Sequence, residues 1–133
     1  MDQAGQKEKK ILVVEDERPL NNALQAALTH AGFTPSPAYD GEQALECLSK
    51  DTYGAVLLDL LLPKLSGLDV MAKMAERKDF TPVIVITNMG QEETKQEVTN
   101  MGAIQYLVKS ETSISDIIKH VQSLVKPGYA QNA

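Results

Sequence analysis

The chain has 133 residues, 43% of them hydrophobic, and a formal net charge of −5 at pH 7. This length suits one domain with one packed core, and the negative charge argues against binding a nucleic acid backbone. The apolar runs are too short to span a bilayer, and no leader-like apolar stretch follows MDQAGQKEKK. The single Cys47 excludes an internal disulfide and fits a reducing compartment. We therefore expect a cytoplasmic domain with no membrane insertion and no direct nucleic acid contact.

Strand and helix patterns alternate along the chain. Short apolar runs predict strands at 10–14, 33–38, 53–59, 81–87 and 103–109. Two prolines restrict the second run to a sheet edge, whereas TPVIVIT, apolar on both faces, predicts a covered parallel sheet. Amphipathic helices separate the strands, and the third carries an expected buried face of Leu68, Met71, Ala72 and Ala75.

Five strand–helix units with short connections predict an α/β fold, in which helices cover both faces of a parallel sheet. We expect one domain over residues 10–126. The tails, 1–9 and 127–133, are expected to be loose.

Polar residues stand where the predicted strands end. Glu15 and Asp16 follow the first strand, Asp59 ends the third, Thr87 the fourth and Lys109 the fifth. Each alone has an ordinary explanation as a helix cap, turn residue, strand former or solvated lysine. Open α/β sheets bind ligands at the carboxyl ends of their strands, at a topological switch point. The five residues together therefore predict one polar crevice.

The residue types in this crevice favour phosphoryl transfer. Clustered carboxylates repel one another, and a hard cation such as Mg²⁺, which prefers oxygen ligands, relieves that repulsion. An aspartate beside Mg²⁺ can act as a nucleophile toward phosphorus. Lys109 and Thr87 would stabilise charge on the phosphoryl oxygens.

Five stretches of the chain, spanning about residues 10–125, match the motifs of a known family in their order and in the elements on which they lie. They are ILVVEDE, YDGEQALECL, VLLDLLLPKLSGLDV, PVIVITN and MGAIQYLVK. They resemble the response-regulator receiver domains of bacterial two-component signalling, of the chemotaxis-regulator type. The resemblance implies a flavodoxin-like, doubly wound sheet of five parallel strands in the order 2-1-3-4-5, with five helices on both faces. It implies phosphorelay signal transduction, with a phosphohistidine on a sensor histidine kinase or phosphotransfer protein as donor.

By this resemblance Asp59 is the phosphoacceptor, and Glu15 and Asp16 are the acidic pair that binds Mg²⁺. The backbone carbonyl of Leu61 would complete the protein's metal ligands, and Lys109 matches the lysine of the family pattern. Slow autodephosphorylation would accompany such a site. The resemblance therefore implies a switch and not a turnover enzyme.

Thr87 and Tyr106 resemble the family's switch pair. The predicted helix at 91–101 offers mainly Val98 and Met101 to a core, so little apolar burial should hold it in one position. We expect phosphorylation to remodel a face within residues 91–125. A downstream protein or a second copy of the chain would bind there.

Two positions depart from the family pattern. The acidic pair is Glu15-Asp16 instead of two aspartates, which keeps the charge and lengthens one arm. Ser110 stands where the family usually has a proline after a cis peptide bond. Because a cis bond before a non-proline residue costs about 2.5–4 kcal/mol, we predict a trans Lys109–Ser110 bond.

Three other functions are alternatives to this interpretation. Mg²⁺-dependent aspartyl-nucleophile phosphatases are similar in fold, but carry the nucleophile after the first strand in a DxD pattern, where this chain has EDE. A degenerate receiver would serve only as an interaction module, and intact Asp59 and Lys109 argue against it. Flavin binding on the same fold would require a phosphate-binding loop after the first strand, and this sequence shows no recognisable loop of that kind there.

Overall fold

The computed structural model describes residues 9–88 and 92–125 of the chain. Strands and helices alternate in the order β1 Lys10–Val14, α2 Arg18–His30, β2 Thr34–Ala38, α3 Gly41–Lys50, β3 Ala55–Leu58, α4 Gly67–Glu76, β4 Val83–Thr87, α5 Glu92–Asn100, β5 Gln105–Val108, a single 3₁₀ turn η1 Lys109–Glu111, and α6 Ile114–Leu124. The tails expected at 1–9 and 127–133 lie outside the described residues, Lys9 excepted. The domain boundaries therefore stay a prediction.

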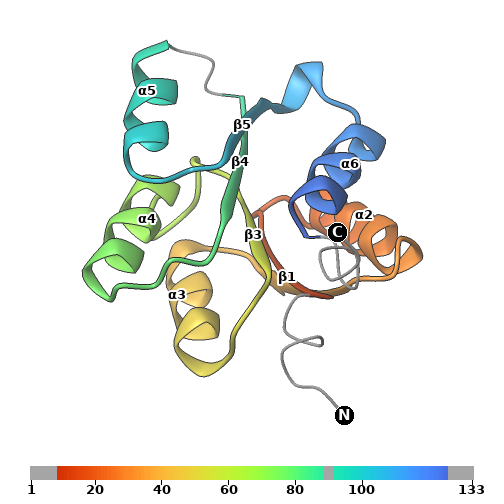
Figure 1. Cartoon of the computed structure of the whole chain (residues 1–133), viewed down its shortest axis with the longest axis horizontal. Helices are drawn as coiled ribbons and strands as arrows, with labels where there is room; N and C mark the ends of the chain where they lie inside the picture. The colour runs from red at the N-terminus through yellow and green to blue at the C-terminus, as the bar shows by residue number, and fades with distance from the viewer. Residues whose placement is uncertain (1–8, 89–91, 126–133) are drawn as a thin grey trace, which may run out of the picture.

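The strands form one parallel sheet in the order β2-β1-β3-β4-β5, which confirms the flavodoxin-like prediction. Figure 1 shows α3, α4 and α5 on one face of the sheet and α2 and α6 on the other. The register places Val14 beside Leu58 and Thr87 beside Val108. The carboxyl ends of neighbouring strands are thus aligned at one edge.

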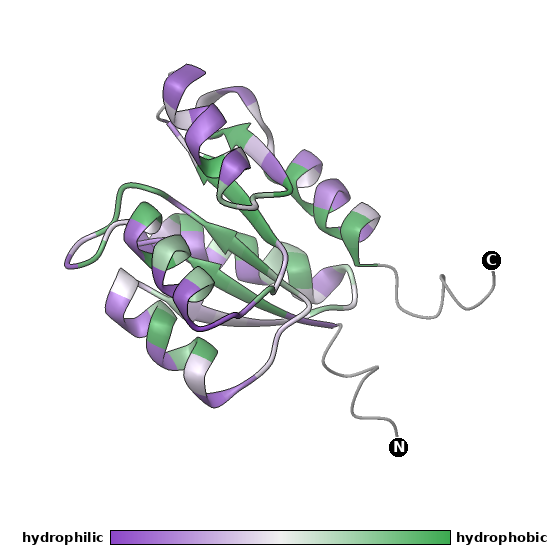
Figure 2. Ribbon diagram, turned by 60° about the vertical axis from the view of Figure 1, so that its left-hand side comes forward, coloured by the Kyte–Doolittle hydropathy of each residue, from purple (hydrophilic) through white to green (hydrophobic). Residues whose placement is uncertain are grey.

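Alternate residues of each strand fill two separate hydrophobic cores. Leu12 and Val14 of β1 pack toward α3, α4 and α5, whereas Ile11 and Val13 pack toward α2 and α6. Figure 2 shows the hydrophobic strands between helices whose outward faces are hydrophilic. This burial on both faces is what the two-sided apolar run at 81–87 predicted.

Local sequence signals set the ends of several elements. Asp40 caps α3, because its Oδ1 accepts a hydrogen bond of 2.8 Å from the backbone N–H of Gln43. The proline-containing β2 is an edge strand. Gly32 follows α2 with φ of 97°, a conformation that favours glycine.

The buried face of α4 differs from the prediction. Met71 is buried and Leu68 half-buried, but Ala72 and Ala75 are exposed, and Val70 and Met74 are buried instead. The larger side chains fill more of the core than two alanines would, so the buried stripe is rotated around the helix.

Within the described ranges, none of the helices combines the length and apolarity needed to cross a membrane.

Candidate functional site

The sheet's own hydrogen bonding holds the backbones of the acidic residues. The N–H of Asp59 donates to the carbonyl of Val14 at 3.0 Å, and the N–H of Glu15 donates to that of Ala38 at 3.0 Å. Both residues therefore continue the parallel ladder just past the ends of β3 and β1. This explains how a carboxylate can follow VLL directly: Asp59 lies where the strand leaves the core.

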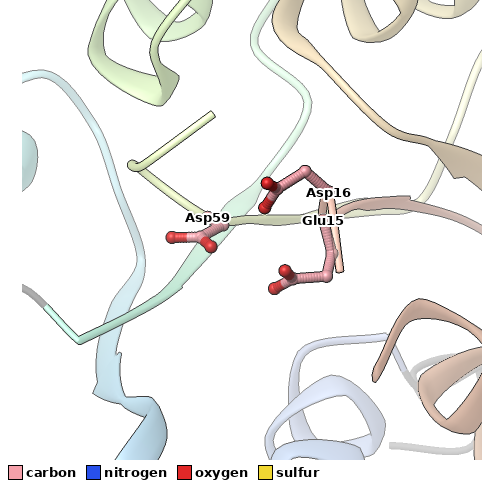
Figure 3. A group of neighbouring side chains, drawn as sticks. All are labelled: Glu15, Asp16 and Asp59. Carbon is pink, nitrogen blue, oxygen red and sulfur yellow. The ribbon is translucent and has the colours of Figure 1, made fainter. Parts of the chain in front are cut away.

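The carboxylates of Glu15, Asp16 and Asp59 converge. One oxygen of each lies within 4.8 Å of one from the other two. Figure 3 shows Glu15 and Asp16 at the end of β1 and Asp59 at the end of β3. Glu15 is fully buried and Asp59 is 3% exposed, whereas Asp16 is exposed.

Lys109 joins the two buried carboxylates. Its Nζ lies 2.7 Å from Oε1 of Glu15 and donates a hydrogen bond of 2.7 Å to Oδ2 of Asp59. Its side chain is only 15% exposed. Backbone N–H groups hold the other carboxylate oxygens: Glu17 donates to Oε2 of Glu15 at 3.0 Å and Leu61 to Oδ1 of Asp59 at 3.1 Å.

Burial and charge act against each other in this cluster. Burial raises the pKa of Glu15 above its ordinary value of 4.5, although Lys109 and the N–H of Glu17 oppose the rise. Burial lowers the pKa of Lys109, but its contacts with Asp59 and Glu15 outweigh that effect and leave the pKa raised. Lys109 is therefore an ammonium across the whole physiological range.

The donor set fits a hard divalent cation. Three carboxylates and one ammonium leave an excess of two negative charges. Oε1 of Glu15 is buried in its ion pair with the ammonium of Lys109. Oxygen-only ligands with excess negative charge suit Mg²⁺. Leu61 contributes its N–H here, and the metal role of its carbonyl stays a prediction.

The predicted switch residues lie at different depths in the sheet. Thr87 is fully buried and ends β4, at the same edge as the carboxylates. Tyr106 is half-buried and pairs with Val85, further from that edge. Its buried hydroxyl has no hydrogen-bond partner among the described residues, and burial raises the pKa of Tyr106.

Asn21 is a supporting residue that the sequence reading missed. Its buried side-chain amide donates to the backbone carbonyls of Val13, Glu15 and Ala38 at 3.2, 3.0 and 3.4 Å. It thereby fastens the start of α2 to the ends of β1 and β2. A signal was present, because Asn21 stands at helical spacing from Leu24 and Leu28, on the buried face.

Gly67 permits close packing beneath Asp59. A Cβ at this position would lie 2.5 Å from the carbonyl oxygen of Asp59 and 2.7 Å from the Cα of Leu60. Both are backbone atoms that cannot rotate away. Glycine at this position therefore allows α4 to begin directly against the end of β3.

The loop after β5 follows the trans prediction. No cis peptide bond occurs in the described part of the chain, so the Lys109–Ser110 bond is trans. The N–H of Ser110 donates to Oδ1 of Asn88 at 3.0 Å.

Comparison with known proteins identifies the family. The sequence pattern of the response regulator receiver domain matches residues 11–122, and the chain belongs to this family. It is 39% identical over 100 residues to the transcriptional regulatory protein DltR of Streptococcus agalactiae, in an alignment covering 75% of this chain and 45% of DltR. The chain thus spans less than half the length of that relative.

Two solved structures are similar over most of the chain. The receiver domain of Francisella response regulator 1452 has a TM-score of 0.84 and 27% identity, covering 89% of this chain and 97% of that one. The Thermotoga maritima response regulator TrrA, solved in complex with Mg²⁺ and BeF, has a TM-score of 0.75 and 29% identity, covering 87% and 98%.

The raised pKa of Glu15 predicts a specific pH dependence of stability. A carboxyl whose pKa is higher in the folded state binds more protons there, so stability falls as pH rises through that pKa. The Glu15→Gln variant lacks this loss. In Mg²⁺-free buffer, urea unfolding should show the variant gaining stability relative to the native protein between about pH 4.5 and pH 7. Parallel pH profiles for the two proteins would contradict a perturbed Glu15.

Proposed function

We propose that this receiver domain accepts a phosphoryl group on the carboxylate of Asp59. The donor is a phosphohistidine on a sensor histidine kinase or phosphotransfer protein. The observation that carries the proposal is the contact of one ammonium, that of Lys109, with both Asp59 and Glu15 at 2.7 Å. Family membership supports a role in phosphorelay signalling.

The chemistry follows from the partners of Asp59. A carboxylate oxygen attacks phosphorus, the P–O bond forms, and the P–N bond to the donor histidine breaks, with the imidazole keeping the electron pair. Lys109 lies where negative charge gathers on the phosphoryl oxygens, and Thr87 supplies a hydroxyl donor from the neighbouring strand end. The N–H of Leu61 orients Asp59 throughout.

Mg²⁺ is the proposed cofactor. When bound, it would neutralise charge shared by the carboxylates and the incoming phosphoryl group. Glu15, Asp16 and Asp59 would hold it, with the Leu61 carbonyl as a further ligand. The TrrA structure, which contains Mg²⁺ and BeF in a similar fold, supports this assignment.

A switching role suits this chain better than turnover catalysis. The phosphatase alternative is not favoured, because the family match is to receivers and Asp59 follows β3 instead of β1. Slow autodephosphorylation would end the signal.

The net charge of −5 supports action through protein partners without direct nucleic acid contact. The single Cys47 supports a cytoplasmic location.

The proposed output surface is the face within residues 91–125, of which 92–125 are described. Only Thr94 and Val98 of α5 are buried, so few contacts hold this helix. Phosphorylation would draw Thr87 toward Asp59, and Tyr106, whose hydroxyl has no hydrogen-bond partner among the described residues, would move into the space left. A downstream protein or a second copy would read the changed face.

Asp59→Asn tests the phosphoacceptor. With Mg²⁺ and acetyl phosphate, intact-mass measurement should show one added phosphoryl group on the native protein and none on the variant, because the amide lacks the nucleophilic carboxylate oxygen. The asparagine keeps an acceptor for the N–H of Leu61, so the local fold is preserved. Equal labelling of the two proteins would refute the assignment.

Thr87→Ala tests the coupling to the output face. The variant should still be phosphorylated on Asp59, because its nucleophile and Lys109 are unchanged. Amide exchange across residues 92–108 should respond to phosphorylation in the native protein and much less in the variant. An equal response in both would mean that coupling takes another route.

A further inference from the structure

Asn88 links the loops that follow Thr87 and Lys109. Its side-chain Oδ1 accepts a hydrogen bond of 3.0 Å from the backbone N–H of Ser110. Thr87 and Val108 are the last paired residues of β4 and β5. The Asn88–Ser110 bond is therefore a cross-strand connection beyond the end of the ladder, made by a side chain.

The segment that carries Lys109 has few other anchors. β5 is an edge strand of four residues, of which only Leu107 is buried. It leads directly into the 3₁₀ turn Lys109–Glu111, which has no buried residue. The residue before the turn, Val108, provides no side-chain cap. The first N–H groups of a helical turn have no partners within it, and Asn88 satisfies one of them from another loop, as an N-cap residue would.

We propose that Asn88 is a positioning residue for Lys109. The ammonium must reach two carboxylates at 2.7 Å each, so a shift of the turn by about 1 Å would lengthen both contacts. Holding the N–H of Ser110 fixes the peptide next to Lys109. Serine makes this possible, because a proline has no backbone N–H to donate.

This inference rests on the proposed phosphoryl transfer and adds a residue to it. It also connects the two strand ends physically, since Asn88 is the neighbour of Thr87 and Ser110 that of Lys109. A movement of Asn88 would thus act on the Lys109 turn as well.

The test compares Asn88→Ala with two controls, Ser110→Ala and Asn22→Ala. Ser110→Ala keeps the backbone N–H, and Asn22 is an exposed asparagine on α2, outside the proposed output face. Loss of one neutral hydrogen bond should slow phosphorylation by acetyl phosphate about three- to tenfold in Asn88→Ala. The controls should react at the native rate. Hydrogen exchange of the Ser110 amide should become faster in Asn88→Ala alone.

Double substitution separates positioning from a general structural effect. In a Lys109→Ala background, Asn88→Ala should not lower the residual phosphorylation rate further, because its effect passes through the ammonium. A further loss of the same size in that background would overturn the proposal. A native phosphorylation rate in Asn88→Ala would overturn it as well.

Failure of the underlying function gives a different result. If phosphoryl transfer to Asp59 is wrong, the native protein and Asp59→Asn label alike whatever stands at position 88. If only the role of Asn88 is wrong, the native protein labels on Asp59 and Asn88→Ala labels at the same rate.

Discussion

The ammonium of Lys109, held between Glu15 and Asp59, is the interaction on which the site depends. These two carboxylates are almost completely removed from water. Without the ammonium they would repel each other, and no hydration would compensate for their charge. One cation in contact with both offsets this repulsion and holds the two side chains close together. The remaining negative charge, with Asp16 at the surface, suits the divalent cation proposed for this site.

The fold provides this arrangement through strand register and through polar groups hidden in the core. Parallel pairing aligns the ends of β1, β3, β4 and β5 at one edge. Asn21 ties the ends of β1 and β2 to α2, and Gly67 lets α4 start against the backbone of Asp59. These contacts hold the carboxylates on rigid elements, whereas Lys109 comes from an edge strand and a short turn with few anchors.

The fold class and the cluster of carboxylates could be predicted because they rest on local patterns, whereas the strand order was implied by the resemblance to receiver domains. Two-sided apolar runs indicate covered parallel strands, and the end of each run marks the sheet edge where Asp59 and Lys109 must lie. The spacing of Asn21 from Leu24 and Leu28 indicates that it is buried. The hydrogen bonds of Asn21 and Asn88 could not be predicted this way, because they reach backbone groups distant in the sequence. The buried face of α4 was predicted wrongly, since alanines fit either side of a helix and packing against the core chose Val70 and Met74 instead.

The stability of Lys109→Met with and without Mg²⁺ tests the central interaction most directly. Methionine keeps much of the apolar stem but removes the charge, which leaves two buried carboxylates facing each other. In Mg²⁺-free buffer at pH 7, the free energy of unfolding should fall by about 2–4 kcal/mol relative to the native protein. Saturating Mg²⁺ should recover most of that loss, because the cation replaces the missing positive charge. A variant as stable as the native protein without Mg²⁺ would contradict the account.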